Sequence, residues 1–405
     1  MNSILIFFEA GIPGFYFMSR FHSHISSSIK IIESYTAIEP FAGHLKKYFA
    51  ANKKYGSKDR KTIASLCYNY FRLGHALKNK TTEEKIFAGL FLTENKANAL
   101  LEALKPALND KIELTLPEKL VLLDINAGNI FPFVNALGEG LKDNSFYESF
   151  LQQPHLFLRL RPGKKSIVQS KLTNAAISFN VLKDECIELE NATSLDDVIK
   201  INKEVVVQDA SSQKVFNYLD TSPVISNKNK LTAWDCCAAS GGKSILLHDK
   251  LKGNLQLTVS DIRENILVNC KKRLQEAGVN IYKSVITDLT KNTSQIGEDS
   301  FSIVICDAPC TGSGTWGRTP EQLLYYKQNN IQEYAKKQKL IAENALQHLT
   351  KDGLFFYITC SVFKKENEAV AEYLKEKFHL QLLQMEYIKG YEIKADTMFV
   401  AVFKK

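Results

Sequence analysis

The segment Thr232-Ala-Trp-Asp-Cys-Cys-Ala-Ala-Ser-Gly-Gly-Lys243-Ser244 decides the fold. Its first residues form an apolar run that suits a buried strand, and a glycine turn then leads into a helix. Gly241 and Gly242 allow the backbone to approach a ligand closely. The turn is not the GxGxxG of dinucleotide-binding proteins, and it lacks the first glycine of the GxxxxGK[ST] phosphate loop. Taken alone, it is either a ligand site or only a tight connection.

Strands and helices alternate through the rest of the chain. Amphipathic helical patterns, such as Glu264–Ala277 and Ile331–Leu349, separate the apolar runs. The predicted strands are Thr232–Cys236, Leu257–Asp261, Val285–Asp288, Phe301–Asp307 and Leu354–Thr359. This alternation predicts an α/β, Rossmann-like domain with a doubly wound parallel sheet.

Acidic residues end three of the later strands. Asp261, Asp288 and Asp307 close the second, third and fourth strands, at the edge where open α/β sheets bind ligands. Asp261 is placed to accept both ribose hydroxyls, Asp288 to reach an adenine amino group, and Asp307 to lie beside the reacting centre. A single strand-end aspartate is usually a turn or cap residue. With the glycine turn, however, four consecutive strand ends indicate a cofactor site, and their spacing favours S-adenosylmethionine over NAD or ATP.

Two cysteines follow neighbouring strands. Cys310 stands in Asp307-Ala-Pro-Cys310, and Cys360 in Tyr357-Ile-Thr-Cys360, so adjacent strands would bring both thiols to one edge. Carbon 5 of a pyrimidine is too weakly nucleophilic to take a methyl group directly, and a thiolate must first add to carbon 6. One cysteine can supply this thiolate and the second can assist its release. Asp307 can hydrogen-bond the edge of the cytosine.

The other cysteines have simpler explanations. A buried cysteine behaves as a small apolar residue, which suits Cys67, Cys186, Cys270 and Cys306, whereas Cys236 and Cys237 line the turn. The eight cysteines form no CxxC pair, so the spacing implies no zinc or other metal site. Without a disulfide-scaffold pattern they indicate a reducing compartment, the cytoplasm.

Composition gives weaker guidance. The chain has 405 residues, 45% hydrophobic and 24% charged, which predicts a soluble protein of two or three domains. The net charge of +8 favours a polyanionic partner but discriminates poorly. Arg159, Arg161, Lys164 and Lys165 form a local basic cluster. Such a cluster is more often a solvated surface, and it gains weight only if the neighbouring domain handles RNA.

The sequence divides into four parts. Residues 1–35 are expected to be an N-terminal extension, with Met18 as the real start. The apolar stretch Ile4–Phe17 within it is too short to cross a bilayer. Residues 36–150 read as helices, for example Ser57–Leu77 and Glu83–Leu104. Residues 151–230 read as a small α+β subdomain, and 231–405 as the catalytic domain.

These motifs together resemble the Fmu/Sun family of RNA (cytosine-C5) methyltransferases. The matching segments are DCCAASGGKS, SDIRENIL with RLQEAGV, TDL, DAPCTGSGTWGRTPE, TCSVFKKENE and, upstream, VVVQDASSQKVFNYLD. SKDRKTIASLCYNYFRLGHAL resembles the NusB-like helical domain of the small-subunit ribosomal RNA (RsmB-like) branch. The resemblance covers most of residues 40–405 and is strongest from 205 onwards.

The resemblance implies roles for particular residues. Cys360 would be the nucleophile and Cys310 the second cysteine, which aids product release. Arg318, Thr319 and Pro320 would belong to a loop near the RNA, and residues 40–230 would carry further RNA-contacting surface. Residues that would contact S-adenosylmethionine or shape its pocket are Cys237, Ala238, Ala239, Ser240, Gly241, Gly242, Lys243, Asp261, Asp288 and Asp307. The family turn reads CAAPGGKT, so Ser240 and Ser244 replace proline and threonine here, and we expect a less rigid turn.

Three rival functions compete with this prediction. In a DNA cytosine methyltransferase the nucleophile would be Cys310, but the TCS cysteine and the helical front end argue against it. A non-enzymatic RNA-binding factor should have lost a cysteine or the glycine turn, and both are intact. A transfer RNA enzyme of the same family stays open, although the NusB-like segment favours 16S ribosomal RNA, with a flipped or looped base as the target. We expect a monomer without metal or membrane association.

Overall fold

The computed structural model describes residues 13–221 and 230–405. The chain divides into two compact units. The helical unit contains the described residues up to Pro132 together with Phe150–Gln152 and Thr319–Tyr326, and the catalytic unit contains the remainder. Most of the expected extension before Met18 lies outside the described residues. The four-part division made from the sequence stays a prediction.

The helical unit is built around one apolar core. Its helices are α1 (Pro13–Ser34), α2 (Phe41–Ala51), α3 (Ser57–Arg72), α4 (Thr82–Thr93), α5 (Ala99–Leu104), α6 (Pro106–Asn109), α7 (Leu116–Leu122) and, from the distant segment, α12 (Gln322–Tyr325). The core includes Ile31 of α1 with Phe41, Phe71 and Phe91, all fully buried. Helix α1 therefore packs as part of this unit, although the sequence analysis placed all of it in an N-terminal extension, residues 1–35.

One helix predicted from the sequence is two separate helices in the structure. We expected a single helix over Glu83–Leu104, but α4 ends at Thr93 and α5 begins at Ala99. The Asn98 side chain accepts hydrogen bonds from the backbone N–H groups of Leu100 and Leu101, which is the geometry of a new helix start. Apolar spacing continued across the break and concealed it.

A four-stranded antiparallel sheet opens the catalytic unit after the short helix α8 (Asn144–Ser149). Its order is β2-β3-β1-β4, and α9 packs beside it. The bounds are β1 (Leu156–Leu160), α9 (Lys165–Asn174), β2 (Asn180–Val181), β3 (Cys186–Leu189) and β4 (Val205–Val207).

The second sheet has seven strands in the order β10-β11-β9-β8-β5-β6-β7. Its elements are β5 (Leu231–Asp235), α10 (Gly242–Lys250), β6 (Leu255–Asp261), α11 (Glu264–Glu276), β7 (Ile281–Ile286), β8 (Phe301–Asp307), α13 (Asn329–Leu346), β9 (Leu349–Thr359), α14 (Glu368–Phe378), β10 (Gln381–Lys389) and β11 (Thr397–Lys404). Strand β5 pairs in parallel with β6 and β8, so the chain order reverses on either side of it. This reversal places the glycine turn at the topological switch point.

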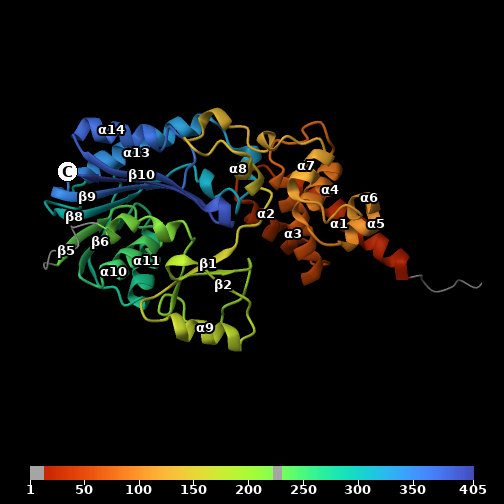
Figure 1. Cartoon of the computed structure of the whole chain (residues 1–405), viewed down its shortest axis with the longest axis horizontal. Helices are drawn as coiled ribbons and strands as arrows, with labels where there is room; N and C mark the ends of the chain where they lie inside the picture. Colours follow the sequence, from red (N-terminus) through yellow and green to blue (C-terminus); the bar gives the residue numbers. More distant parts are fainter. Residues whose placement is uncertain (1–12, 222–229) are drawn as a thin grey trace, which may run out of the picture. The chain divides into compact units, whose positions relative to one another are not determined.

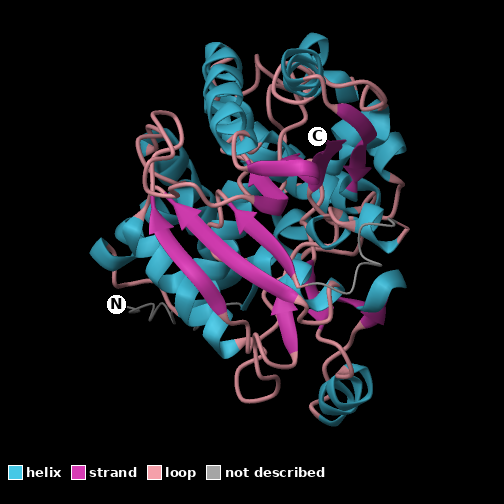
Figure 2. Ribbon diagram, turned by 90° about the vertical axis from the view of Figure 1, so that its left-hand side faces the viewer, coloured by secondary structure: helices cyan, strands magenta, loops and turns pink. Residues whose placement is uncertain are grey.

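Helices cover both faces of the large sheet. In Figure 1, α10 and α11 lie on one face and α13 and α14 on the other. Figure 2 shows the strands side by side between these layers. Two apolar clusters fill the layers, one including Leu257 and Ile303 and the other including Trp234 and Phe355. The predicted Rossmann-like α/β architecture is confirmed.

The sheet is mixed and not wholly parallel. Strand β11 lies antiparallel between β9 and β10, whereas the sequence analysis described a parallel sheet and assigned no strand after residue 359. Strand β11 is buried over most of its length, as expected of an interior strand. Strand β10 is largely exposed and lies at the edge of the sheet.

Candidate active site

The glycine turn joins β5 to α10. Gly241 caps α10 with φ +80°, a conformation that favours glycine, and a Cβ there would lie 2.9 Å from the sulfur of Cys270. Ala239 also has a positive φ, of +45°. The turn is therefore strained and closely packed. Such strain costs stability, and it is typical of segments where the backbone approaches a ligand.

Two serines fix this turn where the family pattern has proline and threonine. The guanidinium of Arg273 donates to the Ser240 hydroxyl at 2.8 Å and also bonds Asn202 and the carbonyl of Val207. The Ser244 hydroxyl donates to Asp235 at 2.6 Å. Side-chain hydrogen bonds thus hold the turn that we had expected to be less rigid.

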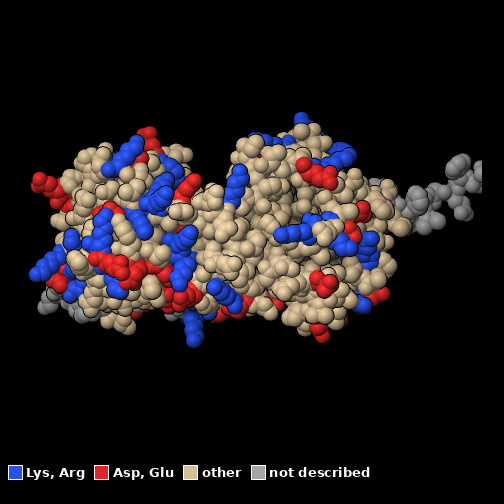
Figure 3. Space-filling model, turned by 90° about the horizontal axis from the view of Figure 1, so that it is seen from above, with Lys and Arg blue, Asp and Glu red and all other residues tan. Residues whose placement is uncertain are grey.

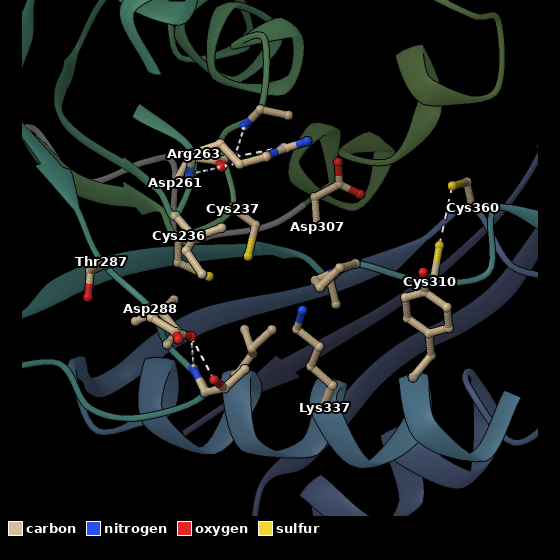
Figure 4. Close-up of a pocket in the computed structure, with 18 residues that line it drawn as sticks. Cys236, Cys237, Asp261, Arg263, Thr287, Asp288, Asp307, Cys310, Lys337 and Cys360 are labelled. Atoms are coloured by element: carbon tan, nitrogen blue, oxygen red, sulfur yellow. Dashed lines mark hydrogen bonds and ion pairs between the residues drawn. The ribbon is translucent and has the colours of Figure 1, made fainter. Parts of the chain in front are cut away.

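A cavity of about 420 Å³ opens at the carboxyl ends of the parallel strands. Of the residues selected from sequence, its lining includes Cys237, Ala239, Asp261, Asp288, Asp307, Cys310 and Cys360. The remaining selected residues do not line it: Ala238, Ser240, Gly241, Gly242 and Lys243. Lining residues that the sequence analysis missed include Ile262, Arg263, Leu289, Pro309, Tyr334 and Lys337. Figure 4 shows the labelled cysteines, carboxylates and Lys337 around this space.

Asp261 is held by its neighbours. Its carboxylate accepts from the backbone N–H of Ala239 at 3.1 Å and from both the backbone and the guanidinium of Arg263. Burial acts to raise the pKa of Asp261, but these hydrogen bonds outweigh it and the pKa is lowered. Ribose hydroxyls could therefore take the expected positions only after the exposed Arg263 side chain moves away.

Asp288 lies just beyond β7, two residues later than the strand end. Its carboxylate accepts from the backbone N–H and hydroxyl of Thr290, and these bonds hold its pKa below the usual range. Ile262 and Leu289 also line the cavity. The carboxylates supply hydrogen-bond acceptors and the apolar side chains supply walls, which together fit a nucleoside, since its hydroxyl and amino groups need acceptors and its base needs apolar surroundings.

Asp307, which lines the cavity, forms an ion pair with Lys243, which does not. The Lys243 ammonium lies 2.7 Å from the Asp307 carboxylate. Burial acts to lower the pKa of Lys243, but Asp307 outweighs it and the pKa is raised. Lys243 therefore stays charged and orients the Asp307 carboxylate, which itself lines the cavity.

The two candidate cysteines meet. The sulfur atoms of Cys310 and Cys360 lie 3.3 Å apart, and both line the cavity (Figure 4). The hydrogen bond with Cys360, followed by burial, raises the pKa of the Cys310 thiol well above its usual value. Cys310 is thus held in its protonated form, with an S–H able to point at the sulfur of Cys360.

Buried Glu366 links the segments that follow both cysteines, and the sequence analysis gave it no role. It accepts hydrogen bonds from Thr311 and Ser361, which directly follow Cys310 and Cys360. The only sequence signal was its position inside TCSVFKKENE. Among the other thiols, Cys67, Cys186, Cys236, Cys270 and Cys306 are buried and Cys237 is partly exposed.

The predicted basic cluster is only in part a solvated surface. Lys164 and Lys165 are exposed, as expected of a solvated surface. Arg159 and Arg161 are instead buried, and both guanidinium groups pair with Asp249 of α10, Arg159 at 2.6 Å and Arg161 at 2.9 Å. Arg161 also donates to the carbonyls of Asn202 and Ala277. These arginines join the small sheet to the large one, so that interpretation was wrong for them.

Arg318 is likewise committed within the catalytic unit. Its guanidinium pairs with Asp209 and Asp396 at 2.9 and 2.8 Å and donates to the carbonyl of His155. Thr319 and Pro320, which were expected in the same loop, belong to the helical unit. Among the described residues, no group of His, Cys, Asp or Glu side chains is placed to hold a metal ion. No described helix is long and apolar enough to cross a membrane.

Comparison with solved structures supports the fold. The crystal structure of PH0851 superposes with a TM-score of 0.68 at 18% identity, covering 98% of this chain and all of that one. A methyltransferase homologue from Pyrococcus horikoshii gives 0.55 at 21% identity, covering 72% of this chain and all of its own. The switch-point cavity and mixed seven-stranded sheet define the class: a Rossmann-like fold of S-adenosylmethionine-dependent methyltransferases.

Sequence comparison finds similarity to the family that the motifs resemble. Residues 223–403 match the family described as 16S rRNA methyltransferase RsmB/F. "Probable ribosomal RNA small subunit methyltransferase B" of Bacillus subtilis is 26% identical over 53% of this chain and 49% of its own. Ribosomal RNA small subunit methyltransferase B of Yersinia pseudotuberculosis is 30% identical over 44% of this chain and 40% of its own. The chain thus spans about half the length of these relatives or less.

Proposed function

We propose that this protein is an S-adenosylmethionine-dependent RNA methyltransferase that forms 5-methylcytosine in small-subunit ribosomal RNA. The observation that carries the proposal is the pair of cysteine sulfurs 3.3 Å apart at the cavity, beside Asp307. The similarity to ribosomal RNA small subunit methyltransferases supports the substrate.

The cavity suits the cofactor. About 420 Å³ is within the usual range for small-molecule sites, and Asp261 and Asp288 offer acceptors at adjacent strand ends. The crystal structure of NSun6 from Pyrococcus horikoshii with SFG superposes with a TM-score of 0.54 at 15% identity, covering 67% of this chain and 99% of that one. When bound, S-adenosylmethionine supplies an electrophilic methyl group.

The chain's own residues provide the remaining chemistry. The Cys360 thiolate adds to carbon 6 of the cytosine, forming a carbon–sulfur bond and making carbon 5 nucleophilic. Asp307, fixed by Lys243, accepts a hydrogen bond from the exocyclic amine of the base and so orients carbon 6 towards the thiolate. After a base removes the proton from carbon 5, the carbon–sulfur bond breaks and Cys360 leaves as a thiolate. The Cys310 S–H can stabilise that departing thiolate.

The reverse assignment, with Cys310 as nucleophile, is the alternative. The raised pKa of the Cys310 thiol disfavours it, because the thiolate is the reactive form. A base must also leave its stack to reach the thiols, so a looped or flipped cytosine is the substrate.

The test is methyl transfer from labelled S-adenosylmethionine to unmodified small-subunit ribosomal RNA. We expect label at carbon 5 of a cytosine, no label with Cys360→Ala, and an accumulated protein–RNA adduct with Cys310→Ala. Cys186→Ala, a buried thiol of the small sheet, is the matched control and should behave as the wild type. Activity that survives Cys360→Ala but disappears with Cys310→Ala would reverse the roles. Labelled transfer RNA with unlabelled ribosomal RNA would move the substrate to the transfer RNA enzymes.

A further inference from the structure

We propose that Glu366 is a positioning residue for the two-cysteine site: its carboxylate ties the segments after Cys310 and Cys360 together and thereby sets the distance between the two sulfurs. This inference rests on the proposed function for its biological meaning. Its geometry can be tested without RNA or cofactor.

Glu366 is fully buried and bonded on both oxygens. One oxygen accepts from the backbone N–H of Thr311 and from the Gln338 side chain, each at 3.0 Å. The other accepts from the hydroxyls of Thr311 at 2.6 Å and Ser361 at 2.5 Å. A buried carboxylate with no ion pair is costly, and these four hydrogen bonds offset part of that cost. Burial still outweighs them, so the pKa of Glu366 is raised.

The bonded groups are those that set the two thiols. Thr311 directly follows Cys310, and Ser361 directly follows Cys360. Gln338 of α13 bonds both Glu366 and the carbonyl of Pro309, which directly precedes Cys310. The carbonyl of Cys360 also accepts from the N–H of Gly314, in the loop after Cys310. The carboxylate is therefore the junction of the two loops, and no bond of its own reaches into the cavity.

The charge of Glu366 has a second effect. It is among the groups that raise the pKa of the Cys310 thiol, after Cys360 and burial. The other titratable groups that face it are Tyr334 of α13, Tyr357 of β9 and Tyr387 of β10, each with a raised pKa. Glu366 thus places the two sulfurs and also favours the protonated form of Cys310.

Two substitutions separate these effects. In Glu366→Ala all four donors lose this acceptor, and the loops keep only their direct links, such as the Gly314 N–H to the Cys360 carbonyl and the Val362 N–H to the Ser313 hydroxyl. In Glu366→Gln the amide oxygen can keep the Thr311 N–H and Gln338, while its NH₂ donates to the two hydroxyls, which reverse their roles. Gln therefore keeps the junction and removes only the charge. Ser361→Ala releases the Cys360 side alone. Glu372→Gln, an exposed glutamate of α14 that pairs with Lys375, is the matched control.

The first measurement is the rate at which diamide joins Cys310 to Cys360, followed by mass spectrometry of the linked peptides. Each thiol loses a proton, the pair loses two electrons to diamide, and a disulfide forms. We expect the rate to fall about tenfold or more in Glu366→Ala and by a smaller factor in Ser361→Ala. It should stay within about threefold of wild type in Glu372→Gln and should not fall below the wild-type rate in Glu366→Gln, where a larger thiolate fraction can only raise it. Circular dichroism and thermal unfolding show whether each variant is folded at the assay temperature.

The second measurement is the alkylation rate of Cys310 by iodoacetamide as a function of pH. Removal of the charge in Glu366→Gln should raise this rate at neutral pH by about tenfold, equivalent to one pKa unit. Glu372→Gln should not change it. With methyl transfer as a third readout, Glu366→Gln should lower kcat and leave the KM for S-adenosylmethionine unchanged.

The outcomes are distinguishable. If folded Glu366→Ala and Ser361→Ala form the disulfide as fast as wild type, Glu366 does not position the thiols. If Glu366→Ala does not fold, unchanged rates in Ser361→Ala together with an unchanged Cys310 pH profile in Glu366→Gln overturn the proposal. If the thiol readouts follow expectation but no RNA is methylated by wild type, the proposed function fails while the positioning role stands.

Discussion

Asp235 ends β5 with a buried carboxyl group, and only one of its oxygens has a partner, the hydroxyl of Ser244. Burial raises the pKa of Asp235 to about 7. In the unfolded chain the proton is lost near pH 4, so between about pH 4 and pH 7 the unfolded state releases a proton that the folded state keeps. Stability from this group is therefore present at low pH and is lost as the pH rises through 7.

Asp235→Asn should remove this dependence. The variant and wild type should have similar free energies of unfolding at pH 4.5. The variant should gain relative to wild type towards pH 8, at about 1.4 kcal/mol per pKa unit. Urea unfolding at pH 4.5, 6 and 8 measures the difference, and a constant difference across that range would contradict the prediction.

Gly241 gives a second prediction at this scale. Gly241→Ala combines an unfavourable φ with a contact of 2.9 Å to Cys270, whereas Gly278→Ala has a similar φ, +70°, and open space around its Cβ. Both variants should lose about 1 kcal/mol from backbone strain. Only Gly241→Ala should lose more than this and bind S-adenosylmethionine more weakly, as measured by calorimetry. Equal effects of the two variants on cofactor binding would show that the close packing of the turn is not needed.

At the scale of elements, Arg159 of β1 and Arg161 just after it are joined to α10 through Asp249. Removal of one partner from a buried ion pair leaves an uncompensated charge, so Asp249→Asn should lower the free energy of unfolding by about 3–5 kcal/mol. Asp220→Asn, which breaks an exposed pair with Lys250, should cost less than about 1 kcal/mol. Chemical denaturation compares the two, and similar small losses would mean that the cluster does not hold the sheets together.

Element type was the part of the fold that sequence could supply. Three apolar runs form strands that end where expected, at Asp235, Asp261 and Asp307. They could be predicted because a buried parallel strand followed by a turn leaves a clear local pattern. The antiparallel pairing of β10 and β11 left none, because the direction of pairing depends on partners distant in the chain.

The candidate site was predicted only in part. The two thiols and the strand-end carboxylates, which were selected from the sequence motifs, line the same cavity. Burial could not be read from charge, so Arg159 and Arg161 were assigned to solvent although Asp249 neutralises them inside the protein. Arg263, Lys337 and Glu366 reach the site through tertiary packing, for which a single sequence has no spacing rule.

At the scale of the whole molecule, the net charge of +8 is not concentrated in one patch on the face drawn in Figure 3. Basic and acidic side chains are interspersed over that face. The densest basic run lies along α2 and α3, where Lys46, Lys53, Lys54, Lys58 and Lys61 are all exposed. If RNA contacts this run, phosphate neutralisation there makes binding depend on salt.

Lys53→Gln with Lys58→Gln should then weaken RNA binding and lower the slope of log affinity against log salt by about 0.7–0.9 per lost contact. Lys375→Gln with Lys377→Gln removes the same charge from α14, where both lysines already pair with glutamates, and serves as the control. Filter binding across a salt series gives both slopes. Identical slopes for the two double variants would place the RNA elsewhere.

The helical unit includes Thr319–Tyr326, a segment that lies almost two hundred residues after the rest of that unit. Within it, His75 bonds the carbonyl of Leu323, and Tyr325 packs edge-on against Tyr35. During synthesis the early helices therefore leave the ribosome without their last partner. At about 5–20 residues per second, roughly 10–40 s pass before that partner is made. The N-terminal part of the chain consequently matures late, and His75 and Tyr35 lack these contacts during that interval.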